Sequence, residues 1–236
     1  MKAIILAGGL GTRISEETLD KPKPMVLING RPILWHIMNI FAAQGVNEFV
    51  VTTGYKGEII DNWVRGLNEP WAITSLDTGV GTQTGGRIKL ALEYMGDDRA
   101  FATYGDGLAN VNLSNLLKKH ELSKLAATVT AVRPPARFGV LESDNGLVTH
   151  FGEKNQADAG WINGGFFVLE RNVTSYVNGV DEPFETGALP GLVNDKALGV
   201  YHHDGFWKPM DTLREKQELE QLAQSGTPPW LKGILK

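Results

Sequence analysis

The chain has 236 residues, 42% of them hydrophobic, which is enough to bury one sizeable core in a single α/β domain. Its formal net charge of −4 gives no electrostatic footprint for nucleic acid, and the absence of cysteine excludes disulfides, a thiolate nucleophile and a thiolate metal site. No apolar run approaches the roughly 20 residues of a membrane span, and the amino-terminal apolar stretch is too short and glycine-rich for a signal peptide. We therefore expect a cytoplasmic protein without nucleic-acid or membrane partners.

Strand-like and helix-like segments alternate through the first half of the sequence. Short apolar runs predict strands at 2–7, 48–53, 72–76, 100–104 and 126–132. Apolar residues at helical spacing predict helices at 32–44, 57–65, 86–94 and 113–121. This alternation is typical of parallel strands joined by helical crossovers, with helices on both faces of the sheet. Ligands of such sheets bind outside the carboxyl ends of the strands.

The second half of the sequence changes character. Apolar runs at 140–142, 147–151 and 162–169 are short, and Asp144-Asn145-Gly146 between the first two is a hairpin signal. A last amphipathic helix is expected at 213–223. The predicted fold class is therefore α/β: a Rossmann-like, mainly parallel mixed sheet flanked by helices, with a small antiparallel subregion. No linker or repeat divides the chain, so a single domain is expected.

A glycine-rich run, Gly8-Gly9-Leu10-Gly11-Thr12-Arg13, follows the first predicted strand. Without a Cβ, glycines let the chain turn tightly and let a phosphate oxygen approach backbone N–H groups. Arg13 adds a planar fork of donors that matches phosphate. The spacing fits neither a P-loop nor a dinucleotide fingerprint, because Ile14 stands where the fingerprint needs a small residue. The run predicts a third kind of phosphate cradle, and a plain glycine turn with a surface arginine is the alternative.

Lys23 supplies a second cation about ten residues after the glycines, between Pro22 and Pro24. The two prolines bias this stretch toward an extended, stiff conformation, which would hold the lysine in place. Two cations beside a glycine-rich strand end favour a site for the polyphosphate of a nucleotide.

Two aspartates stand at candidate metal positions. Asp106, in Tyr104-Gly105-Asp106-Gly107, follows the predicted strand 100–104 and leaves room for a divalent ion that bridges phosphates. Mg²⁺ prefers one or two carboxylates together with waters and phosphate oxygens. Asp211 precedes the last predicted helix. The alternatives are a solvent-facing turn for Asp106 and a helix-capping position for Asp211.

The glycine-rich run, together with Lys21-Pro22-Lys23-Pro24-Met25, resembles the signature of the sugar-1-phosphate nucleotidyltransferases. The resemblance implies that Arg13 and Lys23 are catalytic and contact the phosphates of the two substrates, and that Asp106 and Asp211 jointly hold Mg²⁺. It also implies two small-molecule substrates, a nucleoside triphosphate and a sugar 1-phosphate. The nucleotide-binding part would span about 1–110 and the sugar-binding part about 111–236.

The same resemblance assigns the binding residues of both substrates. The nucleotide is expected to contact Leu6, Ala7, Gly8, Gly9, Gly11, Thr12, Arg13, Thr84, Gly85, Gly86 and Asp106. The sugar phosphate is expected to contact Lys23, Tyr104, Gly139, Glu153, Lys154, Asn163 and Gly164. A helix-start turn is the alternative for the glycines at 85 and 86, and a turn asparagine is the alternative for residue 163.

One segment carries the expected sugar contact. Phe151-Gly152-Glu153-Lys154 resembles the family's Glu-Lys-Pro element, with Asn155 in place of the proline. Glu153 can accept hydrogen bonds from sugar hydroxyls and Lys154 can hold the sugar phosphate. As a bare pair, the two residues would be a solvated surface couple of small energetic weight.

Within the family, four runs resemble the branch that transfers a cytidylyl group from CTP to glucose 1-phosphate. They are Asp77-Thr78-Gly79, Thr84-Gly85-Gly86-Arg87, Ile162-Asn163-Gly164-Gly165-Phe166-Phe167 and the segment 207–214. CDP-glucose, the product of that branch, commonly leads to surface polysaccharides, which implies a role in polysaccharide biosynthesis. The chain departs from the branch by a shorter segment between Trp63 and Trp71.

Three other functions stay open at this point. Another nucleotide or sugar within the same family is the nearest, and a non-catalytic nucleotide-sugar-binding protein is the second. A Rossmann oxidoreductase is the third, although its fingerprint is broken at Ile14. Base rates favour a symmetric homo-oligomer.

Overall fold

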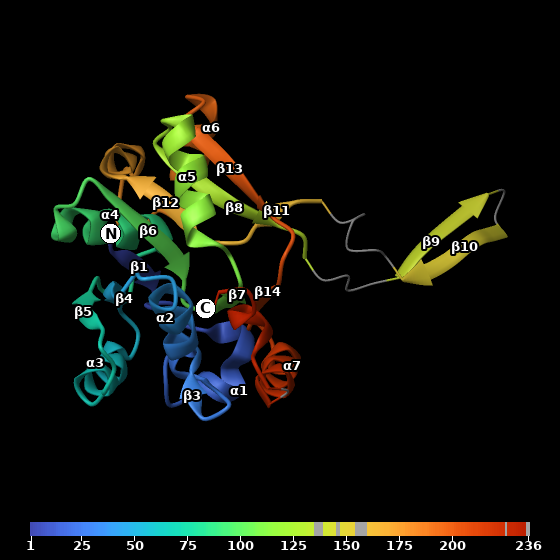
Figure 1. Cartoon of the computed structure of the whole chain (residues 1–236), viewed down its shortest axis with the longest axis horizontal. Coiled ribbons are helices and arrows are strands. Elements are labelled where there is room, and N and C mark those ends of the chain that lie inside the picture. Colours follow the sequence, from blue (N-terminus) through green and yellow to red (C-terminus); the bar gives the residue numbers. More distant parts are fainter. Residues whose placement is uncertain (135–138, 145–146, 154–159, 225, 235–236) are drawn as a thin grey trace.

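A central sheet organises the computed structural model, which describes residues 1–236 apart from 135–138, 145–146, 154–159, 225 and 235–236 (Figure 1). In this described part, eight strands form one sheet in the order β11-β8-β12-β6-β1-β4-β5, with β13 paired to β8. Their bounds are β1 Ala3–Leu6, β4 Glu48–Thr53, β5 Ala72–Asp77, β6 Arg99–Tyr104, β8 Ala127–Val132, β11 Ile162–Asn163, β12 Phe167–Glu170 and β13 Leu198–His203.

The strand directions confirm the predicted mainly parallel mixed sheet. β1 pairs in parallel with both β4 and β6, and β4 pairs in parallel with β5. β13 runs parallel to β8, whereas β12 is antiparallel to β6 and β8, and β11 is antiparallel to β8. Because β1 lies in the middle, the loop that follows it opens at the centre of the sheet's carboxyl edge.

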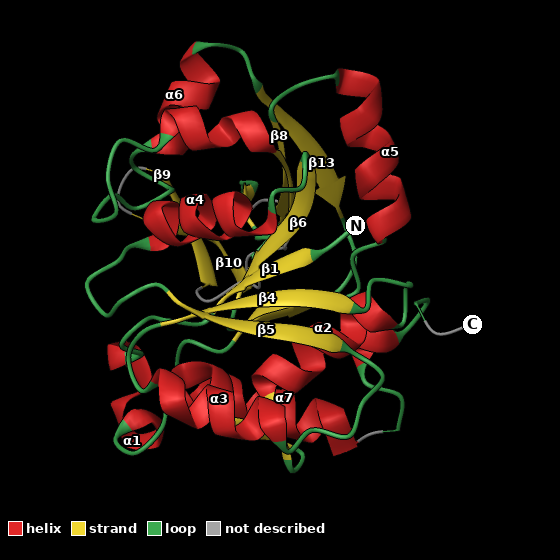
Figure 2. Cartoon of the chain, turned by 90° about the vertical axis from the view of Figure 1, so that its left-hand side faces the viewer, coloured by secondary structure: helices red, strands yellow, loops and turns green. Residues whose placement is uncertain are grey.

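Helices cover both faces of the sheet, as Figure 2 shows. α2 (Ile33–Ala42), α3 (Gly57–Arg65) and α7 (Leu213–Gln224) lie on one face, and α4 (Thr84–Met95) and α6 (Ala188–Asn194) lie on the other. α5 (Leu113–Ser123) packs against β8 and β13. In β1 the side chains alternate between the two cores: Ala3 and Ile5 join the α2 side, and Ile4 and Leu6 join the α4 side. Burial on both faces explains why this strand is continuously apolar.

The predicted hairpin in the second half is confirmed. β9 (Gly139–Asp144) and β10 (Leu147–Glu153) pair antiparallel, and Figure 1 shows them projecting away from the sheet. Two residues of the turn signal, Asn145 and Gly146, lie outside the described residues.

A second antiparallel pair joins distant parts of the chain. β7 (Gly107–Ala109) pairs with β14 (Trp207–Pro209), with Gly107 opposite Pro209. The backbone N–H of Met210 donates to the carbonyl oxygen of Asp106 at 2.8 Å. This pairing brings the two segments that follow β6 and precede α7 together.

The apolar run at 162–169 does not form one continuous strand. It is divided into β11 and β12 by a turn in which Gly165 and Phe166 have φ angles of 75° and 47°. Left-handed backbone cannot continue a strand, and a phenylalanine rarely adopts it. Here the turn carries the Phe166 ring into the core, where it stacks on Phe41 at 5.6 Å between centroids.

Within the described residues, no helix combines the length and apolarity needed to cross a membrane.

Candidate active site

A cavity of about 810 Å³ opens where β1 and β6 end. It draws together residues that the sequence analysis assigned to both substrates and to the metal. The predicted residues on its wall are Leu6, Ala7, Gly8, Gly9, Gly11, Thr12, Arg13, Lys23, Thr84, Tyr104, Asp106, Asn163 and Asp211. Segments from both halves of the chain therefore form one concave site, as is usual for small-molecule sites in α/β sheets.

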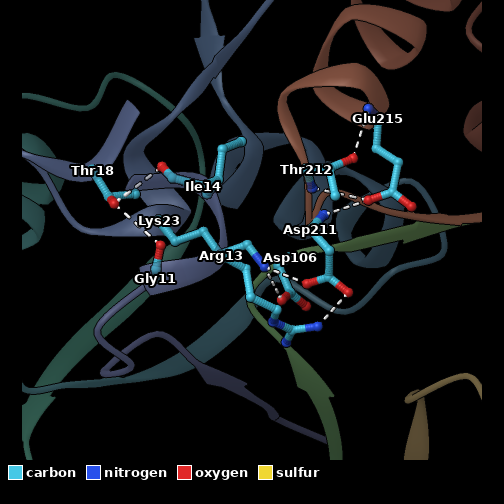
Figure 3. A network of polar contacts seen from close by, with 9 residues as sticks. All are labelled: Gly11, Arg13, Ile14, Thr18, Lys23, Asp106, Asp211, Thr212 and Glu215. Carbon is cyan, nitrogen blue, oxygen red and sulfur yellow. Dashed lines mark hydrogen bonds and ion pairs between the residues drawn. The ribbon is translucent and has the colours of Figure 1, made fainter. Parts of the chain in front are cut away.

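The loop after β1 depends on Gly11, whose φ of 67° lies in the left-handed region. A turn of 3-10 helix, η1 (Thr12–Ile14), begins directly after it. The hydroxyl of Thr18 donates to the carbonyl oxygens of Gly11 and Ile14, at 3.1 Å and 3.2 Å (Figure 3). These contacts hold the loop in one shape beside Lys23.

Lys23 is a buried cation shared by the two predicted metal ligands. Its side chain is only 9% exposed, and its Nζ lies 2.7 Å from Asp106 Oδ2 and 2.7 Å from Asp211 Oδ1 (Figure 3). Arg13 completes the network, with Nη1 2.7 Å from Asp211 Oδ2, although its side chain is 71% exposed. Four residues that are far apart in the sequence thus meet at one point.

The backbone around Lys23 differs from the expectation. Pro22 is extended, with φ −72° and ψ 152°, but Lys23–Met25 form a 3-10 turn, η2, instead of continuing the extended stretch. The turn is closed by donation from Met25 N to the Pro22 carbonyl oxygen at 2.8 Å. The lysine is held firmly as predicted, by a turn and by burial.

Asp211 is not the cap of α7, because Thr212 occupies that position. The Thr212 hydroxyl accepts from Glu215 N at 3.2 Å, and the Glu215 carboxylate accepts from Thr212 N at 3.0 Å and from Asp211 N at 2.8 Å (Figure 3). This reciprocal pattern is a capping box. The Asp211 carboxylate is therefore free of a capping role and turns toward Lys23 and Arg13.

The carboxylates of Asp106 and Asp211 fit a magnesium site. Oxygens from both converge on a single cation, Lys23 Nζ, so they lie close enough to share one ion. Among the described residues there is no group of three or more histidine, aspartate or glutamate side chains placed to hold a metal. Two carboxylates are nevertheless what Mg²⁺ takes from a protein when phosphate oxygens and waters complete its shell.

Arg87 forms the floor of the cavity on the β4 and β5 side. The residue is 3% exposed, and its guanidinium donates to Thr53 O at 2.6 Å, to Gly8 O at 3.0 Å and to the hydroxyl of Thr78. Desolvation lowers its pKa, which the charge of Asp77 partly offsets. A Cβ on Gly8 would overlap this guanidinium, so Gly8 is required by Arg87.

A second polar cluster lines the cavity where α4 begins and β6 ends. Glu185 Oε1 accepts from the Tyr104 hydroxyl at 2.6 Å, and Oε2 accepts from the Thr84 hydroxyl at 2.7 Å. Asn163 Nδ2 donates to the Tyr104 oxygen at 2.9 Å. Burial, and then the negative charge of Glu185, raises the pKa of Tyr104, so this phenol stays protonated.

Several predicted residues do not lie on the described wall of the cavity. Gly85 and Gly86 pack behind it, where a Cβ on Gly85 would lie 2.6 Å from Glu182 O and one on Gly86 would overlap Val180 O. Gly85 N donates to Glu182 O at 3.1 Å. Close packing against the 180–184 segment therefore accounts for both glycines.

Gly164 also packs inward, and its carbonyl oxygen accepts from Trp207 Nε1 at 2.9 Å. Gly139 and Glu153 face each other in register at one end of the β9–β10 hairpin. Lys154 lies outside the described residues. The substrate contacts of these four residues stay predictions.

Arg87 and Glu185 were missed as site residues by the sequence analysis. Arg87 belongs to the run Thr84-Gly85-Gly86-Arg87, but no neighbouring residue in the sequence indicates what its guanidinium binds. Glu185 belongs to the acidic stretch Asp181-Glu182-Pro183-Phe184-Glu185, which has no spacing that distinguishes a site from a solvated loop. In the structure only Glu185 of this stretch lines the cavity.

Known proteins are similar in sequence to this chain over most of its length. Residues 2–212 match the nucleotidyl transferase family. Glucose-1-phosphate cytidylyltransferases from Salmonella typhi and Salmonella typhimurium are each 43% identical over 253 aligned positions, covering 98% of this chain and 98% of theirs. Mannose-1-phosphate guanyltransferase 2 from Candida glabrata is 30% identical over 230 positions, covering 93% of this chain and 63% of its own. The alignments with the two cytidylyltransferases are longer than this chain, so those relatives carry residues that it lacks.

Solved structures show the same fold. HddC from Yersinia pseudotuberculosis, complexed with GMP-PN, superposes with a TM-score of 0.73 at 24% identity, covering 93% of this chain and 98% of that one. The inositol-1-phosphate CTP transferase from T. maritima superposes with a TM-score of 0.69 at 17% identity, covering 95% and 96%. Both bear out the predicted fold class.

Proposed function

This chain belongs to the nucleotidyl transferase family, and from that premise we propose that it transfers the cytidylyl group of CTP to α-D-glucose 1-phosphate. The products are CDP-glucose and pyrophosphate. The choice of both substrates is supported by 43% identity to glucose-1-phosphate cytidylyltransferases over nearly the whole chain.

The observation that carries the proposed chemistry is the network of Arg13, Lys23, Asp106 and Asp211 at the glycine loop. A phosphate oxygen of the sugar substrate is already anionic, so it can attack the α-phosphorus of the nucleotide in line without a general base. Such a reaction needs positioning and neutralisation of charge. Both are what a rigid glycine loop with two cations and two carboxylates supplies.

The four residues take distinct roles in this proposal. Lys23, buried and fixed, binds between the α-phosphate and the sugar phosphate, where two anions must come together. Arg13, exposed at the rim and able to follow a ligand, neutralises the pyrophosphate as it leaves. Asp106 and Asp211 hold Mg²⁺, which supplies charge neutralisation to the nucleotide phosphates when it is bound.

Pairing with Lys23 explains how the two carboxylates stay in position. Lys23 contacts both Asp106 and Asp211 at 2.7 Å, so the pair carries a counter-charge before substrate arrives. Substrate phosphates can take the place of the carboxylates as partners of Lys23, and Asp106 and Asp211 would then be free to hold a divalent ion.

We further infer one domain with the nucleotide in the part at about 1–110 and the sugar in the part at about 111–236. A cytoplasmic location, a role in polysaccharide biosynthesis and a homo-oligomeric state belong to the same proposal. They are supported by the family of the chain and by base rates for oligomers.

A substrate matrix tests the proposed function. CTP, UTP, dTTP, GTP and ATP are each combined with glucose 1-phosphate, mannose 1-phosphate and other sugar 1-phosphates in the presence of Mg²⁺, and pyrophosphate release is measured. We expect the highest kcat/KM with CTP and glucose 1-phosphate. A higher value for another pair would overturn the substrates, and no release with any pair would overturn the enzyme.

A further inference from the structure

A carboxylate stands in the cavity where the mechanism assigns no charge. Glu185 lies in the loop before α6 and joins three elements: Thr84 at the start of α4, Tyr104 at the end of β6 and, through Tyr104, Asn163 of β11. All four residues line the cavity.

The cluster is fixed by further hydrogen bonds to Asn163 and Thr84. Asn163 Oδ1 accepts from Gly165 N at 2.9 Å, which orients the amide, and Thr84 Oγ1 accepts from Phe184 N at 2.8 Å. The raised pKa of Tyr104 keeps its hydroxyl a donor. Because a carboxylate oxygen accepts more than one hydrogen bond, Glu185 can receive a ligand donor without releasing these partners.

The position of the charge indicates which part of a ligand meets it. Arg13 and Lys23 lie at the glycine loop after β1, and Arg87 lies toward β4 and β5. The partners of Glu185 on strands, Tyr104 and Asn163, belong to β6 and β11 on the other side of β1. A carboxylate repels phosphate and binds neutral donors such as hydroxyl groups.

The surrounding wall suits a sugar ring. Ile162 and Trp207 line the same side of the cavity, and the indole of Trp207 is held by its donation to Gly164 O at 2.9 Å. Apolar side chains beside a fixed acceptor can cover the C–H surface of a sugar while the acceptor binds a hydroxyl.

The geometry points to Glu185 as a specificity-determining residue that accepts a hydrogen bond from one hydroxyl group of the sugar 1-phosphate. This inference rests on the proposed function, since it names a further contact with the same acceptor substrate. It differs from the predicted contacts of Lys154 and of Glu153, which ends β10.

The test is the isosteric variant Glu185→Gln, assayed with glucose 1-phosphate and with analogues that each lack one hydroxyl. We expect kcat/KM for glucose 1-phosphate to fall by about ten- to a hundredfold, with KM for CTP unchanged. One analogue should react equally fast with the variant and the unmodified chain, because it lacks the hydroxyl that Glu185 binds. The other analogues should show the full loss.

Asp181→Asn is the matched control, since it removes a carboxylate from the same acidic stretch, and it should match the unmodified chain on every substrate. The inference is overturned if Glu185→Gln loses less than about threefold on glucose 1-phosphate. It is also overturned if the loss falls on CTP, or if every analogue loses equally, as a merely structural role requires. Absence of activity in the unmodified chain would instead overturn the proposed function.

Discussion

At the scale of single residues, Lys23 is the charge on which the site depends. It is the only described residue whose side chain contacts both Asp106 and Asp211, and its burial removes the water that would otherwise screen it. Lys21 lies two positions away in the same loop and pairs with an exposed residue, Asp20. Removing Lys21 therefore measures the effect of losing one positive charge without losing the contacts of Lys23.

Lys23→Ala should lower kcat by roughly a hundredfold or more, since loss of a preorganised charge-stabilising donor costs about 3–4 kcal/mol of barrier. Single-turnover rates at saturating substrates would measure this. Lys21→Ala serves as the control and should keep the unmodified rate. Near-normal rates for Lys23→Ala would contradict the assigned role.

Arg13→Ala should also reduce turnover by about a hundredfold, but for a different reason. Arg13 is exposed and its partner Asp211 keeps Lys23, so the fold should be unaffected. Thermal unfolding is expected to be unchanged while kcat falls. A matching loss of stability would show that Arg13 supports the loop and does not act on the leaving group.

At the scale of elements, the start of α7 separates a structural residue from a functional one. Thr212 caps the helix with Glu215, whereas the neighbouring Asp211 carboxylate turns into the cavity. Substitution of the two adjacent residues should therefore have opposite consequences.

Thr212→Ala should lower the free energy of unfolding by about 1 kcal/mol, the usual effect of losing a helix cap, and leave kcat nearly unchanged. Asp211→Asn should abolish most activity and weaken the dependence on Mg²⁺, with little change in stability. Urea unfolding and a magnesium titration of the rate would measure both variants. Full activity of Asp211→Asn would refute a metal role for Asp211.

Arg87 joins the ends of three strands, because its guanidinium donates to Thr53 in the last position of β4, to Gly8 after β1 and to Thr78 after β5. Arg87→Met removes a donor from the Thr78 hydroxyl and from the carbonyl oxygens of Thr53 and Gly8, although Thr53 O still accepts from Thr78 and Gly8 O from Tyr55 N. We expect the free energy of unfolding to fall by about 1–3 kcal/mol, the usual cost of a buried polar group that loses its partner, and KM for the nucleotide to rise. Arg171→Met, which removes an exposed guanidinium bound to Gly96 O, is the control. Equal stability of the two variants would show that the hydrogen bonds of Arg87 do not hold the three strand ends together.

At the scale of the whole molecule, the carboxyl-terminal segment packs against the core at a buried histidine, His36. His36 of α2 donates from Nε2 to the Ile28 carbonyl oxygen at 2.8 Å, and its ring contacts Trp230 near the carboxyl terminus at 5.5 Å between centroids. Desolvation lowers its pKa below the ordinary value of 6.5, and burial does the same to the pKa of His203.

Stability should consequently fall in mild acid. When folding lowers the pKa of a histidine, the unfolded chain binds more protons than the folded chain in mild acid. The contribution of His36 to the free energy of unfolding is therefore largest above pH 6.5 and decreases as the pH falls below that value. His36→Phe should be less stable at neutral pH but should lose less on acidification. His202→Phe, at an exposed position, is the control. An unchanged pH dependence in His36→Phe would refute this source of acid sensitivity.

Much of the fold could be predicted because local pattern and tertiary burial agree. The continuous apolar run at 2–7 predicted β1 because its side chains enter two cores, and the predicted bounds of β4 and α3 match those of the structure. The break in the apolar run at 162–169 has the opposite cause, since a buried Phe166 holds a left-handed turn that no local pattern favours.

The sequence by itself determined the glycine loop, the two cations, the two aspartates and the family to which they point. These residues stand in short runs whose order and spacing are visible along the chain. Only the tertiary structure decided which groups meet. The β7–β14 pairing brings Asp211 to Asp106, the capping box turns the Asp211 carboxylate inward, and the packing of the 180–187 loop against α4 brings Glu185 into the cavity. Contacts between such distant segments depend on how whole helices and strands pack, and the spacing of neighbouring residues does not indicate this packing.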